Sequence, residues 1–185
     1  MFKFALRTVT AAALVSAAVV SAQAANPKVG GAAMYENKNI IENAVNSKDH
    51  TTLVAAVKAA GLVSTLEGKG PFTVFAPTNE AFAALPAGTV DTLLKPENKA
   101  QLTKVLTCHV VAADAMSMAI AKMIKDDGGE HDVKTVGGCV LKAKQKGKMI
   151  TLTDETGGVA TVTIADVKQS NGVIHVIDKV LLPKS

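Results

Sequence analysis

Two histidines, His109 and His175, have the clearest capacity for chemistry in this sequence, and each lies in an apolar run typical of a strand. An imidazole there can act as a general base, bind a metal ion, or form hydrogen bonds inside a core. Catalysis would also need a nucleophile and an orienting acid, but the chain has no G-x-S-x-G elbow and no H-E-x-x-H helix. We predict that both rings are structural. The alternative, a small hydrolase or metal-dependent enzyme, would require either ring to open into a cleft beside a nucleophile or carboxylate.

The amino-terminal segment has the features of an export signal in the required order. Lys3 and Arg7 precede the apolar run 11–20, and Ala-Gln-Ala at 22–24 is typical of a signal-peptidase site. The apolar run is shorter than the roughly 20 residues that a membrane-spanning helix needs. We predict that residues 1–24 are a cleaved signal peptide and that the mature protein is secreted or periplasmic, without stable insertion in a membrane.

Cys108 and Cys139 are the only cysteines, and export places them where a disulfide forms and persists. An even count favours a bond between them, and closing a loop of this length would stabilise the fold by roughly 3–4 kcal/mol. The alternative is two separately buried thiols, because a sequence does not show whether the two Cβ atoms approach each other.

Asp126, Asp127, Glu130, His131 and Asp132 form the densest acidic cluster, of a kind that can hold calcium. The spacing does not match an EF-hand, and we favour a solvated turn between a helix and a sheet. We predict no bound metal and no cofactor.

Four lysines, at 142, 144, 146 and 148, alternate along an expected hairpin and would project from one face. They could attract anionic polysaccharide or lipid headgroups. We favour a charged edge that prevents strand-to-strand aggregation.

Composition argues against nucleic acid as a partner. Two of the 20 basic residues lie in 1–24, so 18 remain against 16 acidic ones, a formal charge of +2. Arg7 is the only arginine, and the aromatic residues that remain are Tyr35, Phe72, Phe75 and Phe82. Clustered cations and stacking rings are therefore scarce.

The segment 72–86 organises the chain, because it joins a β-rich run to a short helix that Thr78 or Asn79 can cap. An irregular leader at 25–38 comes first. Helices are expected at 39–45, 51–60, 62–66, 89–94 and 96–106, and Thr51 or Thr52 can cap the second of them. Asp114 can cap a further helix, whose apolar face would comprise Ala115, Met118, Ala119, Met123 and Ile124. Strands are expected at 131–136, 139–143, 149–153, 159–164 and 173–182. Helices mainly from the first half, followed by hairpins, predict a single α+β domain.

Two segments carry a family resemblance. FTVFAPTNEAFAALP at 72–86 and NGVIHVIDKVLLP at 171–183 resemble the two signatures of the fasciclin domain, an extracellular adhesion module. LTCHVV at 106–111 resembles the tyrosine-histidine motif of the family, with Cys108 in place of tyrosine. The resemblance implies one domain at 39–183, a wedge of β-strands decorated by helices. It implies structural roles for the residues Phe72, Phe75, Pro77, Thr78, Asn79, Phe82, His109, Asn171, His175 and Asp178.

The segment Asp166-Val167-Lys168 resembles the position at which animal fasciclin domains carry an Asp-Ile integrin-recognition motif. We expect these three residues to contact a partner from a loop before Asn171. Replacing Asp166 and Lys168 by alanine should then change stability by less than about 1 kcal/mol.

These observations predict a non-enzymatic binding module for cell-surface or matrix adhesion. Its partner would be a cell-surface or matrix protein, a polysaccharide, or a second copy of the chain. A further alternative is an exported carrier of a small apolar ligand, which would require an internal cavity.

Overall fold

The structure is a computed structural model that describes residues 26–184. The predicted signal peptide lies outside these residues. The strands are β1 (Lys28–Val29), β2 (Ala32–Ala33), β3 (Phe72–Pro77), β4 (Val110–Val111), β5 (Glu130–Lys134), β6 (Val140–Lys146), β7 (Met149–Thr153), β8 (Val159–Gln169) and β9 (Gly172–Ile177). The helices are α1 (Ile40–Ala44), α2 (Thr51–Ala60), α3 (Val63–Leu66), α4 (Asn79–Ala83), α5 (Thr89–Leu93), α6 (Lys99–Thr107) and α7 (Ser117–Asp126), with short 3-10 turns at Lys48–His50 and Pro96–Asn98. This mixed composition confirms the predicted α+β class.

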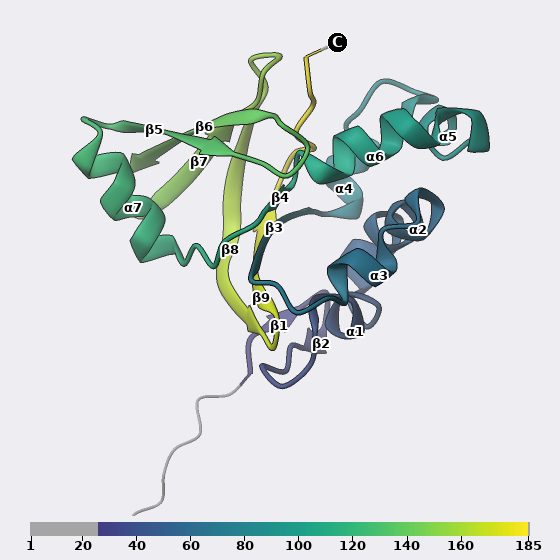
Figure 1. Ribbon diagram of the computed structural model, residues 1–185, viewed down its shortest axis with the longest axis horizontal. Coiled ribbons are helices and arrows are strands. Elements are labelled where there is room, and N and C mark those ends of the chain that lie inside the picture. Colours follow the sequence, from purple (N-terminus) through teal and green to yellow (C-terminus); the bar gives the residue numbers. More distant parts are fainter. Residues whose placement is uncertain (1–25, 185) are drawn as a thin grey trace, which may run out of the picture.

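Seven strands form one sheet in the order β4-β3-β9-β8-β7-β6-β5. Neighbouring strands are antiparallel except β3 and β9, which are parallel. The sheet curls so that its two edge strands meet at one end, where the Val136 amide donates to the Val110 carbonyl at 2.7 Å. The result is a nearly closed wedge of strands with most helices on one side (Figure 1).

Strand β3 and its parallel neighbour β9 are buried on both faces, which explains their continuous apolar sequence. Because side chains alternate along a strand, β3 sends Val74 and Ala76 into a core beneath α1–α6, and Phe75 into a second core beside α7. The motif at 72–86 therefore lies between the two cores.

Several helix ends follow local signals in the sequence. Asn39 and Glu42 form a reciprocal capping box at the start of α1, and Gly61 ends α2 in the left-handed conformation. Thr78 caps α4 through its hydroxyl, which accepts a hydrogen bond from the Ala81 amide. These local signals predicted the helices correctly.

Helix α7 differs from its prediction. Asp114 does not cap it, and Met118, which was expected on the apolar face, is 82% exposed. Ile124, which was expected on the apolar face, is buried in the second core, and Ile120, which was not, is buried beside it. The apolar residues of this segment fit two helical faces, and packing against the sheet selects one of them.

The segment 25–38 was predicted to be irregular, and this prediction is wrong for part of it. Strands β1 and β2 pair as a small antiparallel sheet, and Val29 and Met34 join the core beneath the helices. None of the helices within 26–184 has the length and apolarity to cross a bilayer.

Candidate functional site

Asp166, Val167 and Lys168 lie within strand β8, so the prediction that they belong to a loop is wrong. The pairing with β9 shifts between Ile164 and Val167, because two residues of β8 lie opposite the single residue His175. Such a β-bulge breaks the alternation by which a strand is recognised in a sequence. Asp166 sits in the bulge with φ of 60°, a conformation that aspartate tolerates better than most residues.

The carboxylate of Asp166 holds the start of α7. One oxygen accepts a hydrogen bond from the Ser117 amide at 2.6 Å, and the other accepts one from the Ser117 hydroxyl. The first amides of a helix have no partner within it, and an anion near them is favourable. Asp166 in strand β8 therefore caps α7, the role that the sequence suggested for Asp114.

Val167 is fully buried and lies in the core beneath the helices, which excludes it from contact with a partner. Of the three candidate residues, only Lys168 is exposed.

His175 stabilises the bulge. Its Nδ1 accepts the Asp166 amide at 3.2 Å, which the irregular pairing leaves without a ladder partner, and its Nε2 lies 2.8 Å from the Ala115 carbonyl. The bonding pattern places the proton on Nε2. Burial lowers the pKa of His175, opposed by the Ala115 carbonyl. The neutral ring stacks on Phe75 with the centroids 5.7 Å apart.

His109 is bound in the same way near the other end of the core. Its Nδ1 lies 2.8 Å from the Val105 carbonyl, and its Nε2 accepts the Leu181 amide at 2.9 Å. Burial lowers the pKa of His109 to about 4, with the Val105 carbonyl opposing the change. This histidine links the end of α6 to the segment after β9.

Neither ring has a free nitrogen for a substrate, because backbone groups occupy both nitrogens of each. The serine in the region, Ser117, bonds to Asp166 and not to a histidine. Within 26–184 no three side chains of histidine, cysteine, aspartate or glutamate are grouped to hold a metal ion. The described residues therefore do not form the cleft that the enzyme alternative requires.

The sequence did not indicate a third buried histidine, His50, because it lies in a polar run just before α2. Its Nδ1 lies 2.8 Å from the Ser47 hydroxyl, while its Nε2 has no hydrogen-bond partner among the described residues. Burial lowers the pKa of His50, and the backbone of Ala76 opposes the change.

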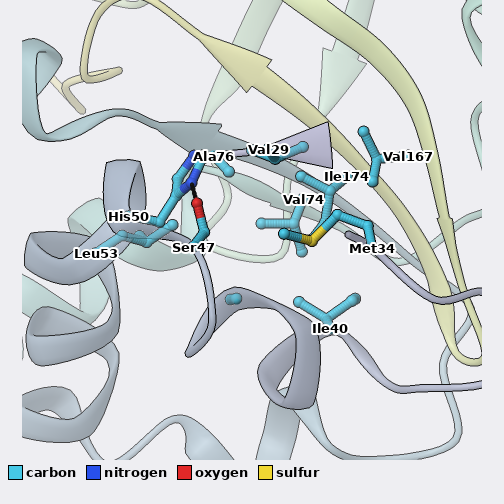
Figure 2. Close-up of a pocket in the computed structure, with 11 residues that line it drawn as sticks. Val29, Met34, Ile40, Ser47, His50, Leu53, Val74, Ala76, Val167 and Ile174 are labelled. Atoms are coloured by element: carbon cyan, nitrogen blue, oxygen red, sulfur yellow. Dashed lines mark hydrogen bonds between the residues drawn. The ribbon is translucent and has the colours of Figure 1, made fainter. Parts of the chain in front are cut away.

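Figure 2 shows an apolar cavity beside this histidine, between Val29, Met34, Ile40 and Ile174. Its volume is about 30 Å³, and a neighbouring cavity around Leu53 and Val57 is of the same size. Ligand pockets measure roughly 300–1,000 Å³. These internal spaces are too small for the ligand of the carrier alternative.

The acidic cluster is largely occupied by ion pairs. His131 Nδ1 donates a hydrogen bond to an Asp127 carboxylate oxygen at 2.6 Å, and Glu130 forms ion pairs with Lys142 at 2.6 Å and Lys144 at 2.9 Å. The register of β5 and β6 places Glu130, Asp132, Lys142 and Lys144 on one face of the sheet. Lys142 and Lys144 therefore neutralise the acidic side chains of Glu130 and Asp132 beside them.

Cys108 and Cys139 are joined by a disulfide, with their Cα atoms 5.4 Å apart. This is the pairing that the sequence predicted. The bond connects the end of α6 to the start of β6, and so holds opposite edges of the sheet together.

The comparisons with known proteins agree with this architecture. The family model described as Fasciclin domain matches residues 48–183. The chain belongs to the fasciclin family. Protein sll1483 of Synechocystis sp. is 49% identical over 155 residues, which cover 84% of this chain and 79% of the relative. The transforming growth factor-beta-induced protein ig-h3 of Sus scrofa is 38% identical over 131 residues, covering 71% of this chain and 17% of the relative.

The fold also resembles a solved fasciclin structure, a FAS1 domain pair from the insect cell adhesion molecule fasciclin I. The TM-score is 0.70, with 16% sequence identity over 78% of this chain and 51% of that one. At this identity the likeness shows a common fold.

Two asparagines of the fasciclin motifs bond to distant segments of the domain. Asn79 accepts the Thr52 amide at 3.0 Å and donates to the Lys48 carbonyl at 2.8 Å, so it caps α2. Asn171 accepts the Ile40 amide at 3.1 Å and donates to two carbonyls before β3. The sequence suggested Thr51 or Thr52 as the cap of α2. The residue that caps it, Asn79, is distant in the chain and could not be recognised from local sequence.

Proposed function

We propose that this protein is an exported, non-enzymatic binding domain for adhesion to cell surfaces or extracellular matrix. The match of residues 48–183 to the fasciclin domain carries the proposal, since the fold is also that of an insect cell adhesion molecule. The backbone bonding of His109 and His175 supports a binding role over a catalytic one. The export pattern at 1–24 and the disulfide agree with a location outside the cytoplasm.

The tip of the β6–β7 hairpin is the surface through which we propose that contact occurs. Lys146 and Lys148 are exposed and have no ion pair among the described residues, whereas Lys142 and Lys144 do. Met149 beside them is 51% exposed. Cations around one apolar side chain suit an anionic polysaccharide, which could approach them without breaking an existing pair. Lys168 on β8 is also exposed.

Binding to polymer-coated beads tests this proposal. The mature protein should bind dextran sulfate and not neutral dextran, and binding should weaken as salt screens the charges. Replacing Lys146 and Lys148 by serine should reduce capture. Replacing Lys58 and Lys95, which are exposed elsewhere, changes the net charge equally and should have little effect.

A Lys168→Ala variant in the same assay shows whether β8 contributes. If the Lys146/Lys148 variant retains full binding while folded, the hairpin is not the contact. If the mature protein captures neither the beads nor cell-surface material, the adhesion proposal fails.

A further inference from the structure

The two edges of the curled sheet meet at one end and separate at the other. At the closed end the Cys108–Cys139 disulfide and the Val136 to Val110 hydrogen bond join them. Toward the open end α7 packs against β5 and β6 (Figure 1), and residues of β4, α7 and β5 line the space between the two edges. The closure is incomplete there, because a helix replaces a strand and makes no ladder hydrogen bonds to either edge.

A groove of about 280 Å³ remains between α7 and these two edges. Its apolar lining comes from four elements and the segment before α7, and includes Phe75, Val111, Ala113, Ile120, Met123 and Val133. It is about nine times the size of either internal cavity. A cavity of roughly 150 Å³ holds benzene, so this space can accept two fused rings.

His131 supplies a polar group at the lining of the groove. Its Nδ1 lies 2.6 Å from a carboxylate oxygen of Asp127, so Nδ1 carries the proton. In the neutral ring Nε2 is then an acceptor, and no described residue forms a hydrogen bond with it. Asp132 and Lys134 also line the groove, and Asp132 is paired with Lys142 at 3.4 Å.

We propose that this groove binds a small amphipathic molecule with a flat apolar body and one hydroxyl group. The body fills the space over Phe75 and Met123, and the hydroxyl donates a hydrogen bond to His131 Nε2. Met123 suits such a site because its flexible, polarisable side chain adapts to ligands of different shape. This role is separate from adhesion through the hairpin tip, which lies on other residues.

Titration of the ¹⁵N-labelled mature protein with 2-naphthol, followed by amide shifts in NMR spectra at pH 8, tests the site. Shifts should saturate and cluster at residues 111–123 and 131–134. The analogue 2-methoxynaphthalene, which lacks the donor, should bind about three- to tenfold more weakly. His131→Phe keeps a flat ring but removes the acceptor, so the protein should lose its preference for the phenol.

Ala113→Leu should fill the groove and weaken binding about tenfold or more. Met118→Ala is the matched control, since Met118 is exposed on α7 and does not line the groove. Circular dichroism checks that each variant is folded. If a variant does not fold, the amide shifts of the unaltered protein still locate the binding site. Absence of saturation, shifts elsewhere on the domain, or full binding by folded Ala113→Leu would overturn the proposal. Ala113→Leu should leave capture by dextran sulfate unchanged, which separates failure of this site from failure of the adhesive one.

Discussion

Replacement of Asp166 by alanine should destabilise the protein far more than a surface substitution does. The change removes the acceptors of the Ser117 amide and hydroxyl at the start of α7. It also places alanine at φ of 60°, which favours aspartate, asparagine and glycine. The sequence alone predicted less than about 1 kcal/mol for this site, and the structure reverses that expectation.

The magnitude follows from these two effects. Loss of a helix cap costs about 0.5–2 kcal/mol, and hydrogen bonds to a charged group contribute about 1.5–3 kcal/mol. The left-handed conformation adds about 1 kcal/mol for alanine. The cap and its hydrogen bonds are the same interaction, so their free energy is counted once. Because Asp166 is only half-buried, we expect Asp166→Ala to lower the free energy of unfolding by about 3 kcal/mol in total. Asp166→Gly lacks the conformational penalty and should cost about 2 kcal/mol, and Asp166→Asn, which keeps one acceptor, about 1 kcal/mol.

Urea unfolding at pH 7, followed by far-ultraviolet circular dichroism, measures these differences. Lys168→Ala is the control, because this neighbour is exposed and should change stability by less than about 0.5 kcal/mol. A cost of about 3 kcal/mol corresponds to a melting temperature lower by about 6–12 °C. If Asp166→Ala unfolds within about 0.5 kcal/mol of the unaltered protein, the capping argument is refuted.

Three further predictions concern the core and its crosslink. Because burial lowers the pKa of His109 to about 4, the unfolded state binds more protons below pH 6.5, so stability should fall between pH 6.5 and 4 by on the order of 3 kcal/mol. His109→Gln should show a shallower decline in urea unfolding at several pH values, and an identical slope would contradict this account. Reduction of the Cys108–Cys139 bond, which spans 31 residues, should cost roughly 3–4 kcal/mol, measured as a drop in melting temperature; two free thiols in protein isolated without reductant would exclude the bond. Asn171→Asp should cost about 2–4 kcal/mol, because a carboxylate cannot donate to the Leu66 and Gly68 carbonyls, whereas exposed Asn46→Asp should cost little; equal unfolding midpoints would argue against a structural role for Asn171.

Helix and strand identities were determined by signals within one or two turns of chain. Asn39 and Glu42 lie three residues apart and satisfy each other, and Gly61 can end α2 without any distant partner. The apolar run at 72–77 is long enough to specify a buried strand by itself. Family membership followed from the same short motifs, since their residues are read without knowing where they lie in space.

The role of Asp166 was decided only by the tertiary structure. Its carboxylate acts on Ser117, 49 residues earlier in the chain, and its amide is satisfied by His175 on the neighbouring strand. The cap of α2 by Asn79 and the burial of His50 depend on distant partners in the same way. The sequence by itself determined the α+β class and the helix ends with local caps, such as those of α1 and α4, and it favoured a bond between the two cysteines, which the structure shows. The bulge, the buried face of α7 and the groove at the open edge arose only on packing, because the free energies that select them come from contacts between segments far apart in the chain.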